Sequence, residues 1–268
     1  MPRFALSGSF TLLLLMLTGQ TAFAQTSASP QALVRDPQGI AILTQSANAA
    51  GGTSAIMAVQ DYSASGEVYY YWGDGEQGTV VVKGRGTGQF RVEATLPEGV
   101  RSWAVSNGTG WVKEADGRTD VIFTHNAANL GSLTFPFAYL VSALQDTSTS
   151  VIYVGLESIN GAQAHHIRVQ KNYPQGSDPT GLFQKLSKRE FFVDASSLLV
   201  VASEDMTHPR DTATVDAVRR VQFSDYRRVN GVLVPFRIAE SVAGQRGETF
   251  QLGQIAFNTG LQDSDFAQ

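Results

Sequence analysis

The sequence predicts an α+β protein built on one large antiparallel sheet of about ten or eleven strands, accompanied by two or three helices. Three observations predict it. From Tyr62 onward, apolar and polar residues alternate with a period of two over most of the chain. Helical spacing of apolar residues is confined to a few short segments. Asn-Gly pairs, which favour the positive φ angles of tight hairpin turns, separate several of the alternating segments: Asn107-Gly108, Asn160-Gly161 and Asn230-Gly231.

The last fifty residues, Val218 to Phe266, carry the strongest strand pattern. Val221 and Phe223 fall on one face of an extended chain, whereas Gln222 and Ser224 fall on the other. The Asn-Gly pair at 230–231 reverses the chain, and a loop containing Gly, Gln and Arg at 244–247 reverses it again. We therefore expect a three-stranded antiparallel meander in this region.

Two segments have the marks of helices. Asp36-Pro37 supplies an N-cap carboxylate and a proline for the first helical position, and the helix that follows is expected to end at Gly51-Gly52. A second helix is expected to begin at Pro136. A short helical turn is also expected at 54–60. Polar loops are expected at 172–181 and 203–217.

The first 24 residues have the pattern of a cleaved export signal. Arg3 precedes the apolar run Phe10 to Leu17, which is too short to span a bilayer, and Ala22-Phe23-Ala24 fits the small-x-small cleavage rule. We expect a mature chain that starts at Gln25, a disordered tail over 25–35, and one domain over 36–268. The expected location is the periplasm.

Composition excludes several kinds of protein. The chain has no cysteine, which excludes disulfides and thiolate metal sites. Its formal net charge of −4 gives no electrostatic case for nucleic-acid binding. After the signal no apolar segment is long enough for a transmembrane helix, so stable membrane insertion is not expected. We expect a monomer.

No residue pattern points to catalysis or to a cofactor. His165 and His166 are neighbours on an expected strand, so their side chains point to opposite faces and do not readily share a metal ion. The glycine-rich segment 84–88 lacks the Lys-Ser/Thr ending of a phosphate loop. A Gly-x-Ser-x-Gly elbow is also missing. We therefore expect a protein that is not an enzyme and that needs no metal or cofactor.

Three stretches carry a family resemblance: VVVKGRGTGQFRVEATLPEG at 80–99, WAVSNGTGWVKE at 103–114 and FSDYRRVNGVLVPFRI at 223–238. They resemble the LolA/LolB lipoprotein-carrier superfamily, which includes the large domain of RseB-type envelope-stress sensors. Family carriers have an Arg-Pro pair after the Val-Lys, and here the corresponding stretch is Gly84-Arg85-Gly86. The resemblance implies a strongly curved, half-barrel sheet whose concave face is covered by the helices.

The resemblance also implies an apolar groove for acyl chains between the sheet and the helices. We expect the groove and its lid to be formed by apolar side chains from several elements, with two arginines as a polar rim. The alternative is that these apolar residues are ordinary core. The candidates are Ile40, Leu43, Trp72, Phe90, Trp103, Trp111, Phe137, Leu140 and Leu144, with Arg85 and Arg91 at the rim.

Two functions follow from the resemblance. The first is an exported carrier or binder of lipid or of lipoprotein acyl chains. The alternative is an envelope sensor or scaffold that binds a protein partner through the same fold. Fold alone does not decide between them, because one fold supports several functions.

Overall fold

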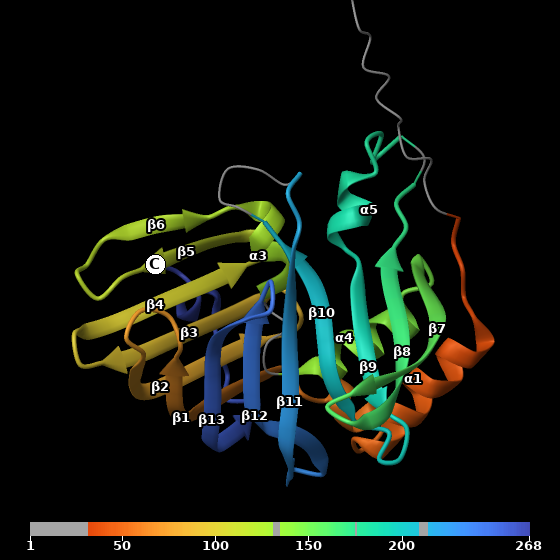
Figure 1. The fold of residues 1–268 in the computed structure, drawn as a ribbon, viewed down its shortest axis with the longest axis horizontal. Helices are drawn as coiled ribbons and strands as arrows, with labels where there is room; N and C mark the ends of the chain where they lie inside the picture. Colours follow the sequence, from red (N-terminus) through yellow and green to blue (C-terminus); the bar gives the residue numbers. More distant parts are fainter. Residues whose placement is uncertain (1–31, 131–134, 175, 209–213) are drawn as a thin grey trace, which may run out of the picture.

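The computed structural model describes residues 32–130, 135–174, 176–208 and 214–268 (Figure 1). The expected signal over 1–24 lies outside the described residues, as does most of the expected tail. The residues of that tail nearest the domain lie against the fold, since Arg35 forms a parallel bridge with Val151.

All strands of the described chain belong to one antiparallel sheet of 13 strands. They are β1 (Asp61–Tyr70), β2 (Glu76–Arg85), β3 (Gln89–Leu96), β4 (Gly99–Ser106), β5 (Thr109–Lys113), β6 (Thr119–Ile122), β7 (Thr149–Ile159), β8 (Ala162–Lys171), β9 (Arg189–Asp194), β10 (Val200–Thr207), β11 (Ala217–Val229), β12 (Val232–Val242) and β13 (Gln245–Phe257).

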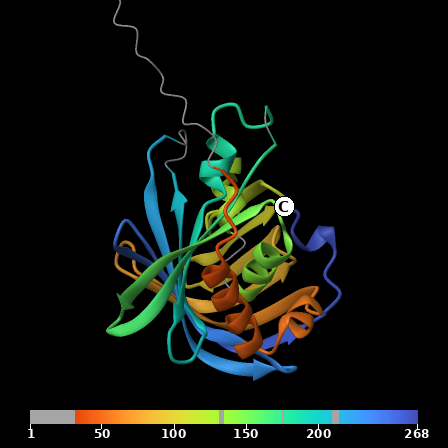
Figure 2. The same ribbon diagram turned by 90° about the vertical axis from the view of Figure 1, so that its right-hand side faces the viewer.

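The sheet is two meanders joined side by side. Strands β1 to β6 follow one another in order, as do β7 to β13, and the meanders meet where β1 pairs with β13. The sheet does not close, because β6 and β7 are its two edges. Figure 2 shows it strongly curved, with helices inside the curve. The expected large, open antiparallel sheet is confirmed.

The expected number of ten or eleven strands is wrong. The edge strand β6 has four residues and pairs only with β5. So short a strand shows little alternation of apolar and polar residues, and the sequence pattern therefore did not reveal it. The polar loop expected over 203–217 is also wrong in its first part, because β10 continues to Thr207. Asp205 of β10 can face the interior because it forms an ion pair with Arg219, its neighbour on β11. Arg219 Nη2 lies 2.6 Å from Asp205 Oδ2.

Short helices accompany the sheet. They are α1 (Pro37–Ala49), α2 (Thr53–Met57), α3 (Thr124–Leu130), α4 (Pro136–Gln145) and α5 (Leu182–Leu186), with a 3₁₀ turn, η1, at Asp263–Asp265. As expected, Asp36 caps α1 by accepting a hydrogen bond from Gln38 N, and Pro136 starts α4. Helices α1 and α4 pack on each other and on β7. We call this helix pair the roof.

Helix α3 lies at one end of the curve, where it contacts β4 and β5 of one meander and β10 of the other. Asn126 of α3 donates a hydrogen bond to His208 O and accepts one from His208 N, both at 2.9 Å. The helix therefore bridges the two halves of the sheet. The main core lies between the sheet and the roof and draws on nearly every strand.

Candidate functional site

The interior between the sheet and the roof is apolar and filled by side chains. Leu43 of α1 and Phe137 and Leu140 of α4 are fully buried, with 0% exposure. Phe90 of β3 is equally buried and packs on Trp103, with ring centroids 5.2 Å apart. The structure brings seven of the nine predicted lining residues into this one core: Ile40, Leu43, Phe90, Trp103, Phe137, Leu140 and Leu144.

The other two predicted lining residues lie elsewhere. Trp72 follows the end of β1, is 43% exposed, and stacks on Tyr70 at a centroid distance of 4.8 Å. Trp111 pairs with Ala104, the neighbour of Trp103 on β4, so the two tryptophans point to opposite faces of the sheet. Of these two, Trp103 is the one that packs against the core.

The two predicted rim arginines share the outer face with Trp111. Arg91 pairs with Ala104, and its guanidinium lies 5.4 Å from the centroid of the Trp111 ring. Arg85 forms an ion pair with Asp263. Both arginines therefore hold the C-terminal segment, residues 258–268, against the convex face, and neither borders the interior. The outward direction of Trp111 could have been found from the sequence. A two-residue turn at Asn107-Gly108 sets Trp103 opposite Val112, and the next residue, Trp111, therefore points to the other face.

Little free space remains inside. A cavity of about 10 Å³ lies beside the start of α4, which is less than one water molecule needs. Its walls are almost wholly apolar: Tyr62, Ala64, Phe135, Val234, Leu252, Ile255 and Phe257. This cavity between the described residues is far too small for an acyl chain.

A larger hollow of about 340 Å³ lies at the edge of the roof, between α4, β8 and α5. We call it the mouth. Tyr173 and Phe183 form one wall, with ring centroids 5.9 Å apart, and Phe183 is 51% exposed. Val169, which belongs to the core, and Tyr139 of α4 lie on its inner side. The mouth therefore connects solvent with the edge of the apolar interior.

Two cations line the mouth. Lys171 Nζ lies 3.7 Å from Asp146 Oδ2 just after α4, and the Arg189 guanidinium lies 4.1 Å from the centre of the Tyr139 ring. Burial raises the pKa of the Tyr139 hydroxyl, so it stays neutral. Arg189 is buried and also lies 3.8 Å from Asp205, whereas Lys171 is exposed. The mouth thus combines aromatic surface with one exposed cation, Lys171. Sequence reasoning missed it, because α5 is only five residues long and Tyr173 and Phe183 lie in and beside an expected loop.

Arg35 ties the C-terminal end of α4 to the edge of the sheet. Its Nη1 donates hydrogen bonds to Ala143 O at 2.8 Å and to Thr149 O at 2.9 Å. Its Nη2 donates to Leu144 O at 2.8 Å. A cation suits the carbonyls at a helix C-terminus. This clamp joins the end of α4 to the start of β7, and it lies outside the residue set predicted from the sequence.

A buried ionic cluster lies on the roof-facing side of β10 to β13. Arg219 forms hydrogen bonds with both oxygens of Asp205 and lies 3.7 Å from Glu240. Burial raises the pKa of Glu240, and it raises that of Glu248 further, with repulsion from Glu240 adding to the effect. Two buried carboxyls that favour the neutral state thus lie beside one well-paired buried cation.

The structure has clear counterparts among solved structures. A Vibrio parahaemolyticus domain whose name refers to outer-membrane lipoprotein sorting aligns with a TM-score of 0.53 at 14% identity, over 86% of this chain and 96% of that one. A LolA superfamily protein from Nitrosomonas europaea aligns with a TM-score of 0.51 at 10% identity, over 84% and 96%. The chain has the LolA-superfamily fold. A DUF1329 family protein from Desulfovibrio piger shares it, with a TM-score of 0.50 at 12% identity over 86% and 96%.

The LolA-superfamily fold is shown here by structure, since no protein-family model and no curated protein matches the sequence. The comparisons agree with the resemblance inferred from the three sequence stretches. Among the described residues, no helix is both long and apolar enough to cross a membrane.

Proposed function

We propose that this LolA-fold chain is an exported, periplasmic, non-enzymatic carrier or binder of acyl chains from lipids or lipoproteins. The observation that carries the proposal is the apolar interior under a two-helix roof, with the mouth at the edge of that roof. The named counterparts are consistent with it, because one refers to lipoprotein sorting and another to the LolA superfamily.

The energy for binding comes from burial of the acyl chain. Each buried CH₂ contributes about 0.8 kcal/mol, so a long chain contributes roughly 10 kcal/mol before ordering costs. No catalytic group is needed for this. The predicted residues in the interior would line the opened groove, with Phe137 and Leu140 of α4 giving way to the ligand.

Binding requires the roof to move. The cavity beside the start of α4 holds only about 10 Å³, so an acyl chain enters there only if α4 lifts from the sheet. The mouth is the place where entry begins, since it has the exposed Phe183 on one wall and the core residue Val169 on another. Lys171, which is exposed at the mouth, would hold the polar end of the ligand, while the chain passes under α4.

A blocking substitution at the mouth tests the proposal. Ser142 is exposed on α4 and lines the mouth, so Ser142→Trp fills the hollow without entering the core. Gln145→Trp is the matched control, because Gln145 is exposed on the same helix and does not line the mouth. We expect wild type and Gln145→Trp to bind a fluorescent C16 fatty acid saturably, and Ser142→Trp to bind it at least tenfold more weakly.

Mass spectrometry of the protein purified from the periplasm gives the second readout. We expect co-purified lipid on wild type and Gln145→Trp, less on Ser142→Trp, and a polypeptide that begins at Gln25. Absence of both co-purified lipid and saturable fatty-acid binding would refute the acyl-carrier function. A polypeptide that retains residues 1–24 would refute the proposed export step alone.

A further inference from the structure

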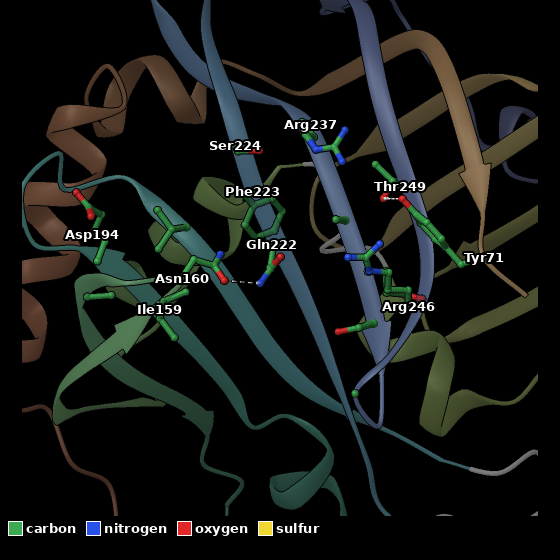
Figure 3. Close-up of a pocket in the computed structure, with 17 residues that line it drawn as sticks. Tyr71, Ile159, Asn160, Asp194, Gln222, Phe223, Ser224, Arg237, Arg246 and Thr249 are labelled. Atoms are coloured by element: carbon green, nitrogen blue, oxygen red, sulfur yellow. Dashed lines mark hydrogen bonds between the residues drawn. The ribbon is translucent and has the colours of Figure 1, made fainter. Parts of the chain in front are cut away.

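A second hollow, of about 550 Å³, lies on the face of the sheet that points away from the roof (Figure 3). Gln222 pairs with Ala239, and Ala239 pairs with Thr249, so these residues share one face. Their neighbours Phe223, Ile238 and Phe250 belong to the core on the other face. The hairpin turn between β7 and β8 forms the opposite wall, where Asn160 accepts a hydrogen bond from Gln222 at 3.4 Å.

Two arginines, Arg237 and Arg246, line this hollow. In Figure 3 the guanidinium groups of Arg237 and Arg246 lie on either side of Thr249. Arg237 makes only a long hydrogen bond to Gln251, at 3.5 Å, and Arg246 lies over the Tyr71 ring at 5.5 Å. Within the described ranges, no aspartate or glutamate forms an ion pair with either arginine. Two guanidinium groups therefore remain available on one wall.

Two acidic residues, Asp194 and Glu240, also line the hollow, and both carboxyls already have partners. Asp194 accepts hydrogen bonds from the backbone N–H groups of Ser196 and Ser197, which lower its pKa. The Glu240 carboxyl lies beside Arg219, and burial raises its pKa toward the neutral form. The wall around Thr249 is thus locally positive on a chain whose net charge is −4.

Thr249 adds a fixed hydroxyl between the two cations. It is buried, and its Oγ1 lies 3.4 Å from Tyr71 Oη, so its position is set by the sheet and by the tyrosine. Farther from Thr249, the hollow is lined by the side-chain amides of Gln222 and Asn160 and by the hydroxyl of Ser224. Two guanidinium forks and hydroxyls match the terminal oxygens of a phosphate, whereas a carboxylate has only two oxygens and is satisfied by one fork.

We propose that this hollow on the convex face of the sheet binds the phosphate group of an organic phosphate. The phosphate lies between Arg237 and Arg246 at Thr249, and the polar body of the ligand extends toward Gln222 and Asn160. The site is separate from the acyl groove, because it lies on the other side of the sheet. The source of the phosphate is either a soluble organic phosphate or an anionic phospholipid headgroup.

The test uses the full mature chain and two probes at low salt. Calorimetry and amide NMR follow titration with glycerol 3-phosphate, and co-sedimentation follows binding to phosphatidylglycerol/phosphatidylcholine vesicles. The test variant is Arg237→Gln/Arg246→Gln, which removes two exposed cations. Arg118→Gln is the matched control, because Arg118 is exposed on the turn between β5 and β6 and does not line the hollow.

We expect one of the two probes to bind, and the double variant to bind it at least tenfold more weakly than Arg118→Gln and wild type. Saturable binding of glycerol 3-phosphate, with shifts at Thr249, assigns a soluble ligand. Binding only to vesicles that contain phosphatidylglycerol assigns a headgroup. Failure of both probes, or equal binding by the double variant, would overturn the proposal. Neither result depends on fatty-acid binding at the mouth.

Discussion

The indole of Trp111 donates a hydrogen bond from Nε1 to the backbone carbonyl oxygen of Phe266, with 3.2 Å between the two atoms. This contact fastens the C-terminal segment to the convex face of β5. The segment is also held at its start, where Asp61 accepts hydrogen bonds from Thr259 N at 2.6 Å and Gly260 N at 3.1 Å. Burial opposes the charge of Asp61, but these hydrogen bonds outweigh it and lower its pKa.

Trp111→Phe removes this hydrogen bond and keeps most of the aromatic surface. We expect the free energy of unfolding to fall by about 1 kcal/mol, which is the usual value of one such bond. Fatty-acid binding should be unchanged, because Trp111 lies on the face away from the roof. Urea unfolding measures the free energy of unfolding, and titration with the fluorescent C16 fatty acid measures binding. Loss of fatty-acid binding at unchanged stability would show that Trp111 borders the ligand after all.

Arg35→Gln removes the clamp on the C-terminal end of α4. We expect the unfolding free energy to fall by roughly 1.5–3 kcal/mol, since the lost hydrogen bonds have a charged donor. Because the roof is then held less firmly, fatty-acid uptake measured by stopped-flow fluorescence should become faster. Arg118→Gln serves as the charge-matched control. A destabilised variant with slower or unchanged uptake would contradict the gating role of α4.

His166 lies between two carboxylates on the convex face of β8. Its Nδ1 is 2.5 Å from Glu157 Oε1, and its Nε2 is 2.9 Å from Glu190 Oε2. Burial disfavours its charged form, but the hydrogen bonds to Glu190 and Glu157 outweigh burial and raise its pKa above 6.5. The protonated imidazole therefore stabilises the fold below pH 6.5, and this contribution is lost as pH rises through the raised pKa.

The pH dependence of His166→Gln checks this sign. We expect wild type to be more stable than the variant at pH 5.5 to 6.5, and the difference to shrink steadily toward pH 9. Urea unfolding across that range measures it. If the stability difference between wild type and His166→Gln stays constant with pH, the His166 ring contributes by packing and its protonation does not stabilise the fold.

Glu248 should destabilise the fold at neutral pH. Burial is the main cause of its raised pKa, so the folded state keeps the proton after the unfolded state has lost it near pH 4.5. Stability from this group therefore falls as pH rises above 4.5. We expect Glu248→Gln to raise the melting temperature at pH 7 to 8 and to have its smallest effect below pH 4. A lower melting temperature at pH 7 would show an ionised Glu248 that is stabilised by its neighbours.

Local features of the chain were predictable from the sequence because neighbouring residues decide them. The turn at Asn230-Gly231 has φ angles of 46° and 89°, and these two residue types adopt such angles at low cost. Asp36 caps α1 as expected, because an N-cap needs only the next few backbone N–H groups. The alternation of Val221 and Phe223 with polar neighbours likewise marked the roof-facing side of β11.

The sequence by itself thus determined most of the strands and hairpin turns, the main helix starts and the antiparallel class of the sheet, but not the full number of strands. Only the tertiary structure decided which groups from distant strands meet. It pairs β1 with β13, places Glu157 and Glu190 around His166, and brings Arg237 and Arg246 into one hollow. The physical reason is that caps and turns depend on bonds within a few residues, whereas pairing across the sheet depends on register and curvature summed over many strands.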